Sequence, residues 1–168
     1  MPNIRDYLGN EYKVLECLGC EIAKKGIIAP GGVVYESDTL IMSGDPEIPI
    51  RGFLVINSKR HINSLTEMTK EERAELIELV AKSIKVIKEL GLTTRVTVLQ
   101  EERSQHFHVW IFPMQDWMKN KYGEGLAHIR EICEDVRENT DAAGRHKVVE
   151  AVEEIKKYFS ESEKHDKI

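Results

Sequence analysis

The sequence lacks a long hydrophobic segment. Its longest apolar runs, such as Phe53 to Ile56, are far shorter than the stretch of about 20 residues that spans a bilayer. The chain does not open with a basic start followed by an apolar stretch, the pattern typical of a signal peptide. We therefore expect a cytoplasmic protein with no membrane partner.

The sequence also lacks a basic patch. The formal net charge is −5, and the acidic residues are spread along the chain. A general nucleic-acid binder usually shows a basic patch or stripe, so we expect no nucleic-acid partner. Small anionic ligands stay open, because one local cluster of positive groups can hold a phosphate inside an acidic protein.

Cysteine is scarce, with three residues in a chain of 168. An odd number, without a signal-peptide pattern, argues against a disulfide framework. Cys17 and Cys20 form a Cys-x-x-Cys pair, which suits a metal or a redox site, and two reduced core cysteines are the alternative. Cys133 lies in an apolar helical pattern and is interpreted as a buried helix residue.

The residues that are present indicate an α+β fold in a single domain over residues 1–168. A hydrophobic fraction of 41% supplies a sizeable core for a chain of this length. Short apolar or alternating runs predict strands, with the third run as the central strand and the last two as an antiparallel hairpin. These runs are Val33 to Tyr35, Thr39 to Met42, Gly52 to Asn57, Thr94 to Gln100, and His106 to Phe112, which ends at Pro113.

One long helix is predicted after the central strand. Thr69 and Glu72 have the spacing of a capping box, in which each side chain bonds to the other's backbone N–H. Apolar residues then recur at helical spacing from Leu76 to Leu90, and Gly91 is a typical helix stop. Further helical patterns follow Pro113, the first residues are expected to form a lead-in helix or loop, and residues 160–168 are expected to be frayed.

The segment from His106 to Pro113 carries the chemistry. Side chains alternate along a strand, so His106, His108, Trp110 and Phe112 share one face, and the opposite face is wholly apolar. A neutral imidazole can attack phosphorus and form a covalent intermediate, and two histidines at this spacing can instead bind a metal. Two polar residues on a solvated sheet face are the remaining interpretation.

This segment resembles the motif of the histidine-triad (HIT) superfamily, which runs His-φ-His-φ-His-φ-φ and is often followed by proline. The resemblance extends over roughly residues 15–113 as a HIT-like core, and residues 114–160 form a helical extension that matches no motif. The other matching pieces, in order, are Cys17-x-x-Cys20, Val33 to Glu36, Gly52 to His61, Thr69 to Arg73, and Val96 to Gln100.

The resemblance implies a HIT-like fold and a role for each matching residue. His108 takes the position of the middle histidine, which in the family attacks the α-phosphate and becomes nucleotidylated. Gln100, Ser104 and Gln105 fall where the family presents polar groups to ribose and phosphate.

Trp110 takes the position of the third histidine, beside the substrate, and this is the main departure from the family motif. An indole donates one hydrogen bond but cannot act as an acid or a base.

The resemblance also implies a structural zinc site. Some family members bind zinc through the Cys-x-x-Cys pair, the histidine after the Lys/Arg-rich turn, and the first histidine of the motif. Here these residues are Cys17, Cys20, His61 and His106. Two thiolates and two imidazoles make a closed tetrahedral site.

The preferred hypothesis is therefore a nucleoside phosphate hydrolase or nucleotidyl transferase with no organic cofactor. Its substrate would be of the dinucleoside polyphosphate or nucleoside phosphoramidate type. Trp110 motivates the alternative of a nucleotide-binding regulatory protein with weak or lost catalysis. A third hypothesis is a catalytic metal on His106 and His108. The resemblance also allows a homodimer, although no residue pattern proves one.

Overall fold

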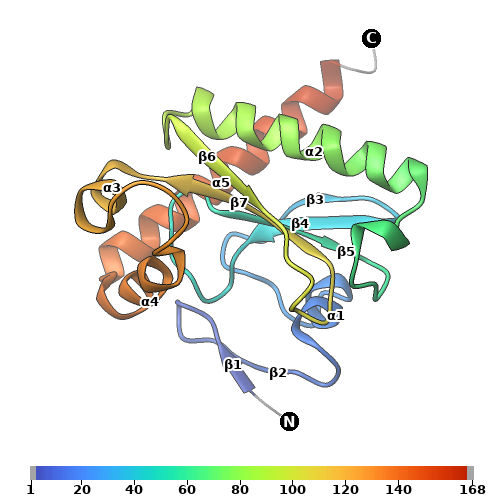
Figure 1. Ribbon diagram of the computed structural model, residues 1–168, viewed down its shortest axis with the longest axis horizontal. Helices are drawn as coiled ribbons and strands as arrows, with labels where there is room; N and C mark the ends of the chain where they lie inside the picture. Colours follow the sequence, from blue (N-terminus) through green and yellow to red (C-terminus); the bar gives the residue numbers. More distant parts are fainter. Residues whose placement is uncertain (1–2, 166–168) are drawn as a thin grey trace.

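A five-stranded antiparallel sheet occupies the centre of the fold, with helices on both of its faces (Figure 1). The structure is a computed structural model that describes residues 3–165. The strand order is β3-β4-β5-β7-β6, which makes β5 the central strand, as the sequence predicts. The strands are β3 (Val33–Glu36), β4 (Leu40–Gly44), β5 (Leu54–Ser58), β6 (Arg95–Leu99) and β7 (His108–Met114). The α+β prediction is confirmed.

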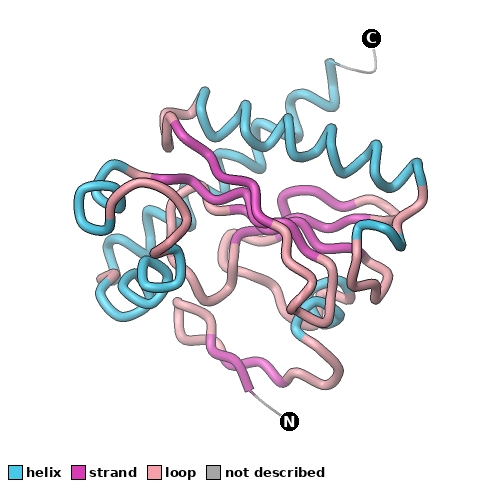
Figure 2. The backbone as a smooth tube through the Cα atoms, in the orientation of Figure 1, coloured by secondary structure: helices cyan, strands magenta, loops and turns pink. Residues whose placement is uncertain are grey.

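The alternation of side chains along β7 divides the core between the two faces of the sheet. Val109 and Ile111 point to one face, where they pack with residues of α2 (Lys70–Glu89) and α5 (Ala142–His165). Trp110 and Phe112 point to the other face, where they pack with residues of α3 (Asp116–Tyr122) and α4 (Ile129–Asn139). The strands therefore lie between two helical layers (Figure 2), and the face that carries His108 is the face that α4 covers.

Helix α2 begins at the predicted capping box. The Thr69 hydroxyl accepts a hydrogen bond from the Glu72 backbone N–H at 3.1 Å, and the Glu72 carboxylate accepts one from the Thr69 N–H at 2.8 Å. Glu72 also forms an ion pair with Arg60 at 2.7 Å, which ties the helix start to the turn after β5. The helix ends at Glu89, just before Gly91, whose φ of 68° is the left-handed conformation that favours glycine.

The bounds predicted for β7 are wrong at both ends. The strand begins at His108, two residues later than expected, and it continues through Pro113 to Met114. Pro113 pairs with Val96 of β6, whereas the pairing of β7 with β5 extends only as far as Ile111. Because β7 has a partner strand on one side only at Pro113, a residue without an N–H is tolerated there.

The two ends of the chain are more regular than expected. The first described residues form a hairpin of β1 (Asn3–Arg5) and β2 (Glu11–Lys13), followed by the short α1 (Leu18–Ala23). Helix α5 continues to His165, so the predicted fraying is wrong for residues 160–165, and residues 166–168 lie outside the described part. A 3-10 turn, η1 (Leu65–Glu67), precedes α2.

Cys133 is buried in α4, as predicted. Within residues 3–165, no helix combines the length and apolarity needed to cross a membrane.

Replacing the cap of α2 should destabilise the protein measurably. Thr69→Ala removes the hydroxyl that accepts from Glu72 N–H, and we expect it to lower the free energy of unfolding by about 1 kcal/mol. The measurement is urea denaturation followed by circular dichroism. Thr94→Ala, at an exposed position between α2 and β6, is the matched control, and an equal loss in both variants would contradict the capping role.

Candidate functional site

His108 lies at the start of β7 with one ring nitrogen fixed by the backbone. Its Nδ1 is 3.0 Å from the carbonyl oxygen of His106 and 3.2 Å from the Ser104 hydroxyl, which itself donates to the same carbonyl at 3.0 Å. A carbonyl can only accept, so Nδ1 carries the proton and donates it to His106. This tautomer leaves the Nε2 lone pair available, and no hydrogen bond of Nε2 occurs within the described residues.

The neighbouring strand places a second polar side chain beside His108. Asn57 of β5 is the direct partner of His108 in the antiparallel register, so the two side chains share a face. Asn57 is 3% exposed, and its amide nitrogen has no hydrogen-bond partner within the described residues. An unpaired buried amide is costly, which makes Asn57 a candidate for contact with a ligand.

Four side chains with metal-ligating atoms converge beside this strand. One potential ligand atom from each of Cys17, Cys20, His61 and His106 lies within 4.8 Å of the others. The Nδ1 atom of His61 is 3.1 Å from Cys20 Sγ and 3.6 Å from Cys17 Sγ, and His106 Nδ1 is 3.5 Å from both sulfurs. Nitrogen and sulfur ligands lie roughly 3.5 Å apart around a tetrahedral zinc ion. The donor set therefore fits a tetrahedral metal.

The orientation of the His106 ring supports this fit. Its Nε2 is 2.8 Å from the Ser58 carbonyl oxygen, so Nε2 carries the proton and Nδ1 presents its lone pair to the cysteines. Burial lowers the pKa of the His106 imidazole below its usual value and raises the pKa of the Cys20 thiol to about 12. Both groups are therefore neutral near pH 7 without a metal, and a bound cation would displace the thiol proton.

Helix α1 approaches the His106 ring so closely that only glycine fits at position 19. A Cβ atom added to Gly19 would lie 2.3 Å from His106 Cγ, far inside van der Waals contact. Cys17 caps this helix, and its sulfur accepts a hydrogen bond from the Cys20 backbone N–H at 3.3 Å. The short helix thus delivers both sulfurs to the imidazoles.

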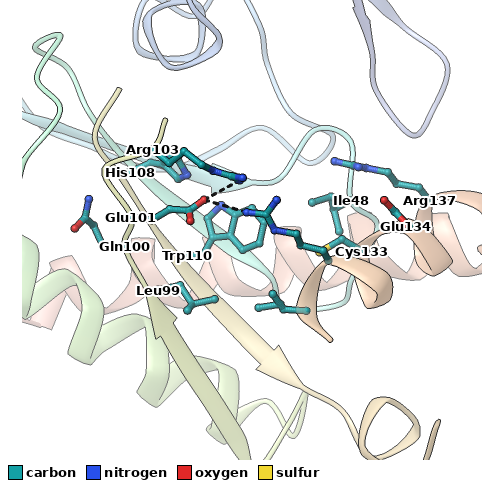
Figure 3. Close-up of a pocket in the computed structure, with 12 residues that line it drawn as sticks. Ile48, Leu99, Gln100, Glu101, Arg103, His108, Trp110, Cys133, Glu134 and Arg137 are labelled. Atoms are coloured by element: carbon teal, nitrogen blue, oxygen red, sulfur yellow. Dashed lines mark hydrogen bonds and ion pairs between the residues drawn. The ribbon is translucent and has the colours of Figure 1, made fainter. Parts of the chain in front are cut away.

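Two cavities meet at His108 and Trp110. The first has a volume of about 380 Å³ and lies between the β6–β7 hairpin and α4 (Figure 3). The second has a volume of about 250 Å³ and lies between β7, α1 and the loop after β4. His108, Trp110, Ile48 and Arg137 line both.

The half-buried carboxylate of Asp45 lines the second cavity. Asp45 Oδ1 accepts hydrogen bonds at 2.8 Å from the backbone N–H groups of Glu47 and Ile48. Burial raises the pKa of Asp45 to about 6 despite these bonds. The lining also includes apolar side chains, such as Leu18 and Ile22, and polar ones, such as Asn57. Such a mixture suits a ligand with a flat apolar part and a few polar groups.

Every residue singled out from the sequence lies at one of these places. Gln100 lines the first cavity, Ser104 and Gln105 line the second, and Trp110 lines both. Asn57, Asp45, Arg130 and Arg137 are further lining residues that sequence reasoning missed. Asn57 could have been found, because it ends the central strand on the face of the histidines. No sequence signal points to the arginines of α4.

Comparison with known proteins identifies the fold. No family model matches the chain. The chain is 29% identical over 100 residues to an uncharacterized HIT-like protein of Methanocaldococcus jannaschii, covering 55% of this chain and 76% of that protein.

Two solved structures resemble the chain more in fold than in sequence. A hypothetical histidine triad nucleotide-binding protein from Sulfolobus tokodaii matches with a TM-score of 0.58 at 18% identity, covering 84% of this chain and 93% of that one. A zinc-bound histidine triad family protein from Mycobacterium smegmatis matches with a TM-score of 0.54 at 17% identity, covering 82% of this chain and 98% of that one. The resemblance noted in the sequence and the HIT-like fold expected from it are confirmed.

The close approach at Gly19 can be tested by a double-mutant cycle. We expect Gly19→Ala to lower the free energy of unfolding by about 1–3 kcal/mol, because the added methyl group overlaps the His106 ring. In a His106→Ala background the same substitution should cost much less, because the overlap is gone. Denaturant unfolding of the four proteins measures the coupling. Equal costs in both backgrounds would show that Gly19 is needed for another reason.

Proposed function

We propose, from the histidine-triad fold that this chain adopts, that it binds a nucleotide and cleaves it at the α-phosphate through a covalent nucleotidyl-His108 intermediate. The enzyme would be a hydrolase when water accepts the nucleotide and a transferase when another molecule does. The observation that carries the proposal is the free Nε2 of His108, held by the Nδ1 hydrogen bond at the point where two cavities meet.

In the first step the Nε2 lone pair attacks the α-phosphorus. A bond forms between Nε2 and phosphorus, and the bond from phosphorus to the leaving group breaks. The leaving group departs with that electron pair, a phosphate as the anion and an amine with a proton from solvent. The imidazole becomes a cation that still carries its Nδ1 proton. The His106 carbonyl, 3.0 Å from Nδ1, stabilises this charge in the intermediate and in the transition state before it.

In the second step water or another acceptor attacks the phosphorus from the side that the leaving group has left. The nitrogen–phosphorus bond breaks, its electron pair returns to Nε2, and the nucleoside monophosphate is released. The acceptor loses a proton to solvent. His108 therefore ends as the same neutral tautomer that began the cycle.

The residues around His108 have distinct proposed roles. Ser104 and Gln105 line the second cavity and would donate to phosphate oxygens, Ser104 by turning its hydroxyl proton away from the His106 carbonyl, while Gln100 lines the first. Trp110 forms an apolar wall, with its ring centroid 6.4 Å from that of His108. The nucleoside would occupy the second cavity, where Asp45 and the apolar side chains suit a sugar and a base.

The metal-ligand cluster is proposed to hold a structural zinc ion through Cys17, Cys20, His61 and His106. The ligand spacing, the buried His106 with its Nδ1 lone pair directed at the cysteines, and the fold shared with a zinc-bound protein support this proposal. Zinc would join α1 to the segment before β7 through coordination bonds to these side chains. His106 would then stabilise the fold as a zinc ligand, while His108 performs the reaction.

Trp110 favours a second candidate function. Because an indole cannot move a proton, the chain could bind nucleotides tightly without turning them over. Such a protein would bind AMP but form no adduct with any activated nucleotide. The following experiment separates the two functions.

Covalent catalysis predicts a nucleotide adduct that depends on His108. Intact-protein mass spectrometry after brief incubation with diadenosine polyphosphate or adenosine phosphoramidate should show an AMP-sized adduct on the wild type and none on His108→Ala. His128→Ala, at an exposed histidine outside both cavities, is the matched control and should keep the adduct. Undiminished turnover in His108→Ala would contradict the mechanism. Binding of AMP by the wild type without any adduct would favour the second candidate function.

Metal content distinguishes a structural zinc site from a metal on the two strand histidines. Elemental analysis should find about one zinc per wild-type chain, a loss of most zinc in Cys17→Ser, and full retention in His108→Ala. The melting temperature should fall with Cys17→Ser or chelator, because a closed site contributes folding free energy. If zinc survives in Cys17→Ser and disappears in His108→Ala, the ion is bound by the His-x-His pair instead.

A further inference from the structure

Helix α4 brings arginines to the cavity that contains the nucleophile. Arg130 and Arg137 of α4 line the first cavity together with Arg103 of the loop between β6 and β7 and with His108. Figure 3 shows Arg103 beside His108, with Arg137 on the helix. Arg137 also lines the second cavity, so it is the arginine common to both. This helix lies in residues 114–160, the segment that matches no motif.

The arginines are held weakly by local acidic groups. Glu101 lies 3.2 Å from Arg103 and 4.0 Å from Arg130, and all three side chains are more than half exposed. Glu134 also lines the cavity. Arg137 forms no ion pair within 4.0 Å among the described residues, and the acidic group with which its charge interacts is Asp45. Exposed ion pairs contribute little, so an entering polyanion can replace Glu101 as the partner of these arginines. Guanidinium groups are well suited to phosphate, because they donate two parallel hydrogen bonds.

The chemistry of the leaving group favours the same conclusion. A phosphate group departs as a stable anion that needs no proton at the moment of bond cleavage, whereas an amine must be protonated. Trp110 lies next to His108 on the same strand face and cannot donate such a proton. Cations beside the leaving group, in contrast, stabilise the negative charge that develops on a departing phosphate.

We infer that Arg103, Arg130 and Arg137 form a subsite for the phosphate groups of the leaving group. The substrate class is then a nucleoside whose α-phosphate is joined to further phosphates, as in nucleoside or dinucleoside polyphosphates. This inference rests on the proposed function and specifies its leaving group. It also assigns a task to α4, which shapes the site from outside the HIT-like core.

The test compares an anionic leaving group with a neutral one. We expect Arg130→Gln and Arg137→Gln each to lower kcat/KM for diadenosine tetraphosphate by about tenfold or more, the scale of a lost charge-assisted hydrogen bond. Both variants should change the lower kcat/KM for adenosine phosphoramidate, whose amine leaving group takes its proton from solvent, by less than about twofold. Lys147→Gln, which removes one positive charge from the exposed surface of α5, is the matched control and should change neither value. An equal loss for both substrates, or no loss, would overturn the subsite.

A binding measurement tests the subsite apart from catalysis. Trp110 lines the first cavity, so tripolyphosphate should change its fluorescence in a Trp117→Phe background that leaves Trp110 as the remaining tryptophan. We expect saturable binding that weakens about tenfold with Arg130→Gln or Arg137→Gln and is unchanged with Lys147→Gln. If wild type forms no adduct but binds tripolyphosphate in this way, the proposed function fails and the subsite stands. If tripolyphosphate binding is absent or insensitive to both arginines, the subsite fails whatever the turnover.

Discussion

The candidate site depends on the hydrogen bond that the His106 ring donates to the Ser58 carbonyl. This 2.8 Å bond turns the other ring nitrogen toward the two cysteines. The same residue uses its backbone carbonyl to hold His108 Nδ1. One histidine therefore joins the metal-ligand cluster to the nucleophile, with its ring serving the first and its backbone serving the second. A shift of the segment before β7 would disturb both at once.

Trp110 changes the chemistry of the site more than its architecture. Its ring contacts Phe53 edge-on, with centroids 5.0 Å apart, and lies nearly parallel to Phe112 at 6.3 Å. These contacts make the indole part of the apolar core below α4, so it is held rigidly between the two cavities. A histidine at this position could transfer a proton, whereas the indole supplies only a rigid apolar surface. Stabilisation of a departing leaving group would therefore come from nearby charged side chains and not from proton transfer by Trp110.

Much of this arrangement could be predicted from local sequence patterns. The period of two along β7 placed His108 and Trp110 on the face opposite Val109 and Ile111, and the Thr69 capping box placed the start of α2 correctly. Such features depend on near neighbours in the chain, where backbone geometry determines which side chains meet.

The remaining features depend on contacts between distant segments. Arg137 lines the same cavities as His108 only because α4 folds back over the sheet, and no pattern in the sequence of α4 predicts that position. The continuation of β7 through Pro113 depends on where β5 stops pairing. The full length of α5 depends on its packing, for example Phe159 against the core and Tyr158 with Glu89 of α2. Periodicity alone does not contain this information.

The separation along the chain of the four metal-ligating residues has a consequence for the unfolded protein. Cys17 and His106 are 89 residues apart, and the segment between them contains β3, β4, β5, α2 and β6. An ion that remained bound to both ends would close a loop containing four of the five strands of the sheet. The conformational entropy of the unfolded chain would fall, and the gain grows with the logarithm of loop length. The cluster would then stabilise the sheet by restricting the disordered ensemble, in addition to any contact it makes in the folded state.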